Sequence, residues 1–175
     1  YLGKQLNATG DQIGNAYLAF SIAMIISPFI GAVADRYFAA QKVLGFLNLV
    51  GAGLLFVLSQ INDASNFFWF ILAYCLCFAP CIALTTSISM RHIASPEKDF
   101  PTIRVMGTIA WIAVTNLIGI LDLGDKVAIF QIAMFTSAGM GLLAFTLPNT
   151  PPRATGPVNI GQIIGADAFT LFKDR

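Results

Sequence analysis

The stretch Asp99-Phe-Pro-Thr-Ile-Arg-Val-Met-Gly-Thr-Ile-Ala-Trp-Ile112 carries an arginine into a long apolar run, and it decides how the rest of the chain is interpreted. A guanidinium at bilayer depth costs from ~2.5 to over ~10 kcal/mol, so charged groups there usually face a bundle interior or a water-filled cavity. On a helix, the spacing i, i+4, i+7 puts Arg104, Thr108 and Trp111 on one face. This stripe suits a polar ligand with a flat ring. Alternatively, Arg104 lies near a helix end and extends to the lipid headgroups.

The composition indicates a membrane protein. Hydrophobic residues make up 57% of the chain and charged residues only 11%. The mean hydropathy of +0.75 exceeds that of a soluble globular domain. The net charge is +1, and no basic run indicates nucleic acid as a partner. Cys75, Cys77 and Cys81 lie in one apolar run without metal-ligand spacing, so we expect small packing residues rather than a metal or redox site.

Five apolar segments are each long enough to span a hydrocarbon core of ~30 Å at a rise of ~1.5 Å per residue. They cover approximately residues 13–33, 43–61, 67–88, 100–121 and 127–147. The preceding residues are polar and turn-rich, and Thr9 or Asp11 is expected to cap the first helix. Ser95 followed by Pro96 marks the start of the fourth. We therefore expect an all-α membrane bundle over residues 1–147.

Small and polar residues within these segments indicate where helices approach one another. We expect close packing at five glycines: Gly45, Gly51, Gly53, Gly139 and Gly141. The hydroxyls of the run Thr85-Thr-Ser-Ile-Ser89 either hydrogen-bond to another helix or line a cavity, and the former is the commoner role. The same two roles are open for Gln131, while Asn48 is the one strong polar group of its segment.

Basic residues are distributed unevenly between the two sets of connecting segments. One set contains Arg36, Lys42, Arg91, Lys98, Arg153, Lys173 and Arg175, and the other contains only Lys4 and Lys126. Because cytoplasmic loops carry the excess of Lys and Arg, residues 34–42, 91–99 and 148–175 are predicted to be cytoplasmic and Tyr1 to lie outside. His92 is expected to be an exposed loop histidine rather than a proton-coupling group.

The segment from Gly31 to Lys42, expected to be a loop, contains Asp35 and Arg36 four and five residues after the glycine. It resembles the Gly-x-x-x-Asp-Arg signature of the major facilitator superfamily, although only Lys42 remains of the later basic positions. In that superfamily, the loop follows the second helix, and its Asp and Arg make gating contacts. The resemblance implies that Gly31 permits close helix approach while the charge pair forms and breaks. An ordinary charged turn is the alternative.

The resemblance to one family within this superfamily is more specific. Residues 99–109 look like the fifth helix of the bacterial nucleoside:proton symporters, and residues 165–173 are similar to the central loop of that family. Five spans that start outside are one helix short of a half transporter. The chain is thus identified as an amino-terminal half lacking its first helix, with spans two to six of an expected twelve. Residues 148–175 would form the cytoplasmic central loop, with an amphipathic segment from Ile160 to Arg175 along the inner surface.

The resemblance implies both a site and a mechanism. The family residues matching Arg104, Thr108 and Trp111 bind nucleoside, although the best-known members have Phe at the third position. Transport would follow alternating access in the bacterial inner membrane and be driven by protons. No carboxylate lies within a span, and Asp122 is the nearest. The coupling acid and most other nucleoside contacts are therefore expected in the carboxy-terminal half; no cofactor is expected.

Two other functions remain open. A major facilitator transporter for a sugar or another polar metabolite would share the signature but contact its substrate differently. A non-transporting membrane interaction protein would use Arg104 to pair with a partner's acid. An enzyme is not expected, because the only histidine lies in a predicted loop and the sequence contains no nucleophile–base or metal constellation.

Overall fold

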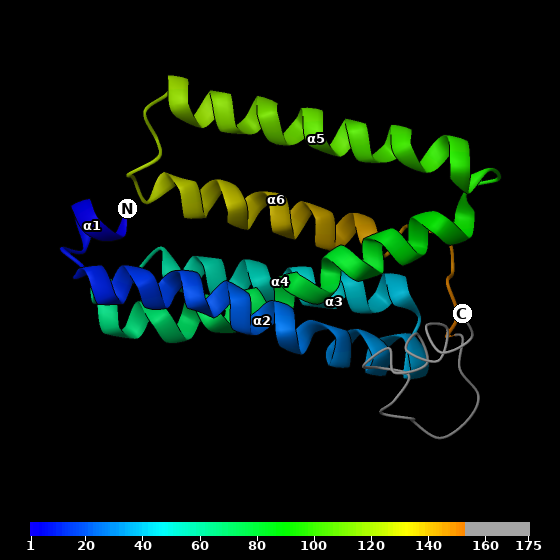
Figure 1. Ribbon diagram of the computed structural model, residues 1–175, viewed down its shortest axis with the longest axis horizontal. Helices are drawn as coiled ribbons and strands as arrows, with labels where there is room; N and C mark the ends of the chain where they lie inside the picture. Colours follow the sequence, from blue (N-terminus) through cyan, green and yellow to red (C-terminus); the bar gives the residue numbers. More distant parts are fainter. Residues whose placement is uncertain (153–175) are drawn as a thin grey trace, which may run out of the picture.

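The computed structural model describes residues 1–152, except for the side chains of residues 32, 35 and 36. This part of the chain is helical, as expected, and is drawn in Figure 1. Its helices are α1 (Leu2–Gln5), α2 (Gly10–Tyr37), α3 (Ala40–Leu58), α4 (Ala64–His92), α5 (Pro96–Ile120) and α6 (Ala128–Ala144). Helices α2 to α5 are long and apolar enough to cross a membrane. The fifth predicted span, α6, has only 17 residues.

The start of α2 is determined by a capping box. The backbone N–H of Thr9 donates to Gln12 Oε1 over 2.9 Å, and the backbone N–H of Gln12 donates to Thr9 Oγ1 over 3.4 Å. Two otherwise unpaired amides at the helix start are thereby satisfied. Thr9 is thus the cap, one of the two residues predicted for it. The short helix α1 was not predicted and lies within the segment expected to be irregular.

The predicted loop from Gly31 to Lys42 is wrong in its extent. Helix α2 continues through Asp35 and Arg36 to Tyr37, and α3 begins at Ala40. Charged residues lower the hydropathy at the end of an apolar span, but they do not by themselves end its helix. A Cβ atom added at Gly31 would meet no described atom within 4 Å, so no close helix approach is seen there.

Other helix ends differ from the prediction for the same reason. Helix α4 runs past residue 88 to His92, which is exposed at the helix terminus rather than in a loop. Ser95 occupies the N-cap position of α5, as predicted, but its side chain makes no capping bond. Instead, the backbone N–H of Ser95 donates to Asp99 Oδ2 over 3.2 Å. Acidic Glu97 and Asp99 in this first turn also suit the positive end of the helix dipole.

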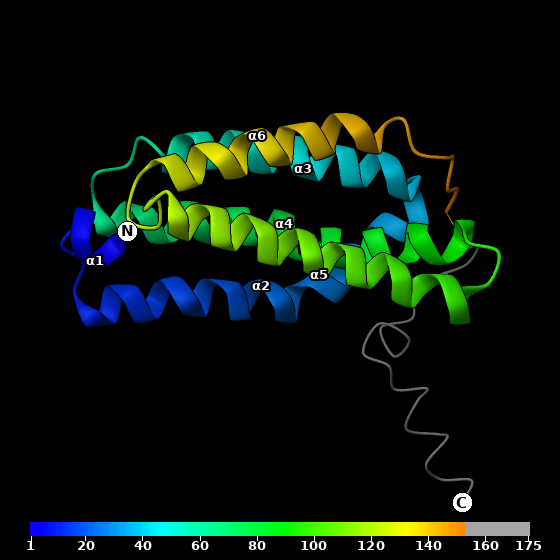
Figure 2. The same cartoon turned by 90° about the horizontal axis from the view of Figure 1, so that it is seen from above.

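Helices α2, α3, α4 and α6 form the packed bundle. Helix α3 packs against α4 and α6, and α2 packs against α4; Figure 2 shows α4 between α2 and α3. One core cluster contains Leu44, Leu84 and Ile88, all buried. Another, at the opposite end, contains Leu58, Phe67 and Phe130. Cys75 and Cys81 are also buried, as predicted for packing residues.

Two of the predicted glycine contacts form where α3 crosses α6. A Cβ added at Gly45 would lie 2.8 Å from the Phe145 ring and 3.1 Å from the Gly141 carbonyl oxygen. One added at Gly141 would lie 2.9 Å from Leu49 Cγ. At Gly51 the nearest atoms would be at an ordinary contact distance of 3.6 Å, and Gly53 and Gly139 face open space. The prediction is therefore confirmed only at the crossing itself.

After α6, the chain folds over the ends of α3 and α4. The side chain of Gln41, which is buried, accepts a hydrogen bond from the Thr150 backbone N–H over 2.9 Å and donates to Asn149 Oδ1 over 2.8 Å. His92 Nε2 lies 3.0 Å from Thr150 Oγ1, and Arg91 donates to the carbonyl oxygen of Pro151 over 2.8 Å. We call these contacts of residues 149–151 the exit clasp.

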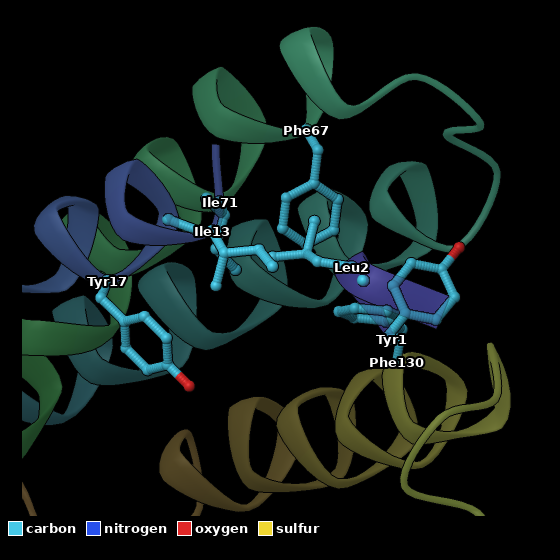
Figure 3. Close-up of a pocket in the computed structure, with 9 residues that line it drawn as sticks. Tyr1, Leu2, Ile13, Tyr17, Phe67, Ile71 and Phe130 are labelled. Carbon is cyan, nitrogen blue, oxygen red and sulfur yellow. The ribbon is translucent and has the colours of Figure 1, made fainter. Parts of the chain in front are cut away.

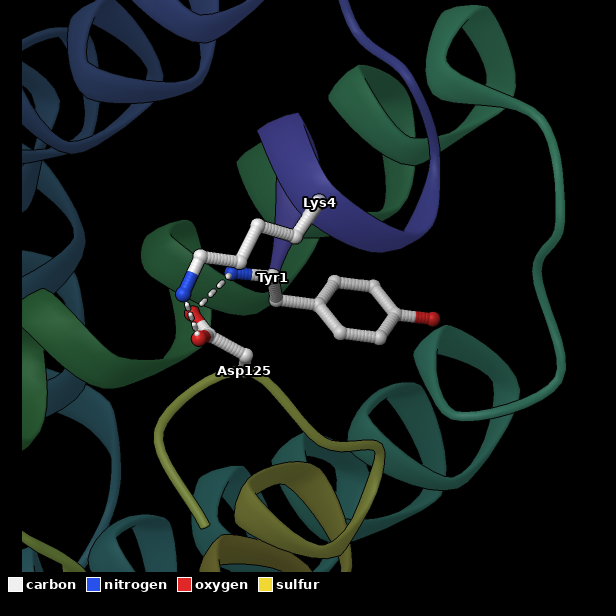
Figure 4. Close-up of polar contacts among 3 residues, drawn as sticks. All are labelled: Tyr1, Lys4 and Asp125. Atoms are coloured by element: carbon white, nitrogen blue, oxygen red, sulfur yellow. Dashed lines mark hydrogen bonds and ion pairs between the residues drawn. The ribbon is translucent and has the colours of Figure 1, made fainter. Parts of the chain in front are cut away.

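The opposite end of the bundle is closed by an ion pair. Lys4 Nζ bonds to Asp125 Oδ2, and the backbone nitrogen of Tyr1 lies 3.6 Å from Asp125 Oδ1 (Figure 4). Asp125 belongs to the turn between α5 and α6, so α1 is joined to that turn. Lys4 and Lys126 therefore lie at the end opposite to Arg91 and the exit clasp, as the division of basic residues predicts.

Candidate ligand-binding cavity

Helix α5 stands at the edge of the bundle and bounds a large opening. None of its residues is buried within the part of the chain that the structure describes, and Figure 1 shows it apart from α2 and α3. A cavity of about 720 Å³ lies along its inner face. Arg104, Thr108 and Trp111 all line this cavity, so the helical spacing read from the sequence brings the three together as predicted.

The α5 wall of the cavity carries donors and an aromatic face. The Arg104 guanidinium carbon lies 6.0 Å from the centroid of the Phe100 ring, at the outer limit of a cation–π contact. Thr108 Oγ1 donates to the Arg104 carbonyl oxygen over 3.0 Å, which leaves the hydroxyl oxygen as an acceptor. Trp111 is 69% exposed. This wall can bind a ligand that accepts hydrogen bonds and has a flat ring.

The α4 wall presents hydroxyl groups that also line the cavity. Thr85 Oγ1 donates to the Cys81 carbonyl oxygen over 2.7 Å, and Ser89 Oγ donates to the Thr85 carbonyl oxygen over 2.9 Å. Thr86 bonds in the same way to Ile82. Because each proton is already donated along the helix, the oxygen atoms offer acceptor positions to the cavity. Of the two roles predicted for this run, lining a cavity is the one seen.

Asn48 connects the cavity with the packed bundle. Its Nδ2 donates to the Leu44 carbonyl oxygen over 2.8 Å and lies 3.5 Å from Cys81 Sγ. Ser137 on α6 donates to the Asn48 carbonyl oxygen over 2.9 Å. Ser137 Oγ also lies 3.4 Å from the Asn48 side-chain Oδ1. Through its backbone and its side chain, Asn48 therefore joins α3 to α4 and α6, and it also lines the opening. Gln131, by contrast, is exposed on α6 and does not line the cavity.

A second cavity, of about 330 Å³, lies at the end closed by Lys4 and Asp125. It is lined by α1, α2, α4 and α6 and is mainly apolar (Figure 3). The Phe130 ring meets that of Tyr1 nearly edge to face at 5.0 Å and that of Phe67 at 5.9 Å. No charged side chain lines it among the described residues. Its polar side-chain groups are the hydroxyls of Tyr1 and Tyr17, so it offers few contacts that could orient a polar ligand.

The described carboxylates do not line the large cavity. In the described part of the chain, every acidic residue belongs to a helix end or a connecting turn: Asp11, Asp35, Asp63, Glu97, Asp99, Asp122 and Asp125. Asp122 is exposed in the turn after α5, where its φ is 49°. The six of these residues whose side chains are described do not line the cavity with Arg104.

Of the predicted gating residues, Gly31 does not line the cavity, and the side chains of Asp35 and Arg36 are outside the described residues. The predicted amphipathic segment from residue 160 to residue 175, with the stretch 165–173 that resembles a central loop, also lies outside them. Phe100 was not predicted, although it lies one helical turn before Arg104, at the same four-residue spacing that identified Thr108.

Membrane-length helices around an opening with polar walls define this chain as part of a multi-pass membrane protein. It belongs to the nucleoside H⁺ symporter family, whose sequence model matches residues 1–175. The proteins it resembles include the putative nucleoside transporter YegT of Escherichia coli (strain K12), 41% identical, and the xanthosine permease of the same strain, 33% identical. These alignments cover 100% and 99% of this chain but 43% of each relative.

Solved structures agree with this assignment. A crystal structure of a variant of the nucleoside transporter NupG matches 99% of this chain with a TM-score of 0.88 and 28% identity. A second NupG structure gives a TM-score of 0.87 and 26% identity. Each match covers 44% of the solved chain, so this chain spans less than half the length of the relatives it matches. The all-α membrane fold and the predicted major facilitator half-bundle are thereby confirmed.

Proposed function

We propose that this chain forms the amino-terminal half of a nucleoside:proton symporter of the bacterial inner membrane. Its first helix and carboxy-terminal half would be supplied by the rest of the complete protein, which moves nucleoside by alternating access. The observation that carries the proposal is the convergence of Arg104, Thr108 and Trp111 on one cavity. The substrate class is supported by the relatives, which are nucleoside transporters and a xanthosine permease.

The chemistry of the cavity suits a nucleoside. The Arg104 guanidinium would donate to substrate oxygens, and the Trp111 indole would stack on the base. Base–aromatic stacking is worth about 1–3 kcal/mol per base. In the complete transporter, further helices would occupy part of the opening beside α5. The volume of about 720 Å³ therefore describes the space left within this half and not the substrate pocket.

The gating and coupling roles are parts of the same proposal. Asp35 and Arg36 in the last turn of α2 would make contacts that form and break as the two halves rock. With residues 34–42, 91–99 and 148–175 cytoplasmic, these contacts would lie at the inner face. No described carboxylate reaches the cavity, so the acid that takes up the proton would come from the carboxy-terminal half.

Nucleoside uptake by the complete protein tests this proposal. The protein is expressed in a strain without its own nucleoside uptake, and entry of labelled uridine and adenosine is followed with and without a proton uncoupler. We expect uptake that the uncoupler abolishes. Arg104→Gln should reduce uptake strongly at unchanged membrane abundance, because a cationic donor is lost at the site.

Thr108 and Thr115 provide a matched pair on α5. Both donate to the carbonyl oxygen four residues earlier, over 3.0 and 2.8 Å, but only Thr108 lines the cavity. Thr108→Val should therefore raise the KM for nucleoside, whereas Thr115→Val should not.

The alternatives predict different results. Competition by sugars but not by nucleosides would favour transport of another polar metabolite. Full uptake by an inserted Arg104→Gln protein would remove the binding role of this residue. No uptake of either nucleoside, from wild-type protein shown to be in the membrane, would contradict the proposal and leave a non-transporting role for the bundle.

A further inference from the structure

We propose that Phe100 is a positioning residue of this site, which holds the Arg104 guanidinium at the cavity wall. The inference rests on the proposed function, because its consequence is measured as nucleoside affinity. Phe100 and Arg104 are four residues apart on α5, and both line the cavity. The guanidinium carbon of Arg104 lies over the Phe100 ring, 6.0 Å from its centroid.

The direction of side chains on a helix explains this contact. Every Cα–Cβ bond in an α-helix tilts toward the helix N-terminus, so the Arg104 side chain leans back over residue 100. With the proposed orientation, the N-terminus of α5 is its cytoplasmic end. Without a contact that holds it, a long cationic side chain with this direction would extend to the lipid headgroups.

The Phe100 ring holds the guanidinium by a cation–π contact. An aromatic face attracts a cation through its quadrupole, and it does so more strongly where water is excluded. Phe100 is half-buried, whereas Arg104 and Thr108 are exposed toward the opening. The ring is thus better anchored than the side chain it holds. The Arg104 guanidinium then stays beside the cavity, with its N–H donors available to a ligand.

The other phenyl ring in the cavity does not have this role. Phe78 on α4 also lines the opening, but it stacks on Tyr74 with ring centroids 5.8 Å apart and an interplanar angle of 19°. Among the described rings that line this cavity, Phe100 is the one in cation–π contact with Arg104. The position of the guanidinium therefore depends on residue 100 in particular.

The test compares kinetic constants for labelled uridine uptake by the complete transporter. Phe100→Leu keeps an apolar helix-forming side chain but removes the ring. We expect its KM to rise about three- to five-fold with little change in maximal rate per inserted protein. Phe100→Tyr restores an aromatic face and should bring the KM back. Phe46→Leu is the matched control, since Phe46 lies at a similar distance from the start of α3 and lines neither cavity.

A double variant separates positioning from general packing. In an Arg104→Gln background, measured at higher substrate concentrations, Phe100→Leu should add no further rise in KM, because the ring no longer holds a cation. An additive rise would overturn the proposal, as would an unchanged KM for Phe100→Leu alone. Both results presuppose nucleoside uptake by the wild-type protein. Absence of that uptake would contradict the proposed function, whereas normal uptake with a KM indifferent to residue 100 would contradict only this inference.

Discussion

In the proposed nucleoside site, Trp111 would be the residue that most affects which substrates are accepted. It presents an aromatic face in the stripe that starts at Arg104, and its indole N–H adds a donor that a phenyl ring lacks. The family resemblance implies Phe at this position in the best-known members. A larger face with a polar edge changes which bases fit well, while the requirement for a flat ring stays the same.

We predict that Trp111→Ala raises the KM for nucleoside about ten-fold, because a stacking contact of ~1–3 kcal/mol is lost. Trp111→Phe should keep most of the affinity but change the order of preference among uridine, adenosine and xanthosine. Trp69 is the only other tryptophan and serves as the control. It is 66% exposed, close to the 69% of Trp111, but it meets Phe68 at the far end of α4 and lines neither cavity.

Uptake kinetics for the three variants, corrected for protein in the membrane, check this prediction. Equal losses for Trp69→Ala and Trp111→Ala would indicate that both rings act through membrane insertion. An unchanged KM for Trp111→Ala would show that the ring does not touch the substrate.

Residue-level prediction succeeded where helical spacing alone determines the neighbours. Arg104, Thr108 and Trp111 share a face on any α-helix, and so they line the same cavity. Phe100 shares this face too, because it lies four residues before Arg104. It was not predicted, because a phenyl ring has no charge or hydrogen-bond donor that would indicate a role in binding. The side-chain contacts of Asn48 could not be predicted, because Ser137 and Cys81 are brought to it only by packing.

At the scale of helices, the close approach of α3 to α6 depends on two glycines, Gly45 and Gly141. The carbonyl oxygen of Gly141 would lie 3.1 Å from a Cβ at Gly45, so the two backbones are already in contact. A backbone cannot move aside as a flexible side chain does. The separation of these helices is therefore determined by the absence of two methyl groups.

We predict that Gly45→Ala destabilises the protein by about 1–3 kcal/mol, the usual cost of overpacking a close-packed region. Gly53→Ala on the same helix is the control, since a Cβ there meets nothing within 4 Å. It should leave stability unchanged or raise it slightly through better helix propensity. Thermal unfolding of the complete protein in detergent measures both. Equal midpoints for the two variants would contradict a tight crossing.

Element prediction depended on the kind of signal available. Apolar length identified five helices, and residue type narrowed the cap of α2 to Thr9 or Asp11. The ends of two spans were placed too early, near residues 33 and 88, whereas the helices end at Tyr37 and His92. Hydropathy falls at the interface while the helix continues. The five glycines looked equivalent in the sequence, yet only Gly45 and Gly141 are in tight contact, since the rotation of each helix is determined by its neighbours.

At the scale of the whole molecule, the ion pair between Lys4 and Asp125 joins two segments that are 121 residues apart in the sequence. The hydrogen bond from Lys4 lowers the pKa of the Asp125 carboxyl, and the same bond raises the pKa of Lys4. A lowered carboxyl pKa gives stability that is lost as the pH falls through the folded value. A raised lysine pKa gives stability that is lost as the pH rises through the folded value.

The pair should therefore stabilise the protein over a wide range of pH. The stabilisation is lost on the acidic side below the ordinary pKa of aspartate, and on the alkaline side above the ordinary pKa of lysine. We predict that Asp125→Asn lowers the unfolding midpoint at pH 7 by about 2 °C or less, since the pair is exposed. The difference should shrink in high salt and at acidic pH. Asp122→Asn is the control, because it changes the same turn and asparagine tolerates its positive φ. A difference that persists in high salt would show that the ion pair is not its cause.

The exit clasp determines how tension along the backbone reaches the bundle. A pull on the chain beyond Pro151 does not first unwind the end of α6, because Thr150 is held by Gln41 of α3 and Pro151 by Arg91 of α4. The load is shared by α3, α4 and α6, because α3 packs against both of the others. Helix α2 packs on α4 and would follow it. Any mechanical coupling between this half and the remainder of the protein would therefore move these four helices as one body, with α5 left as the part able to shift on its own.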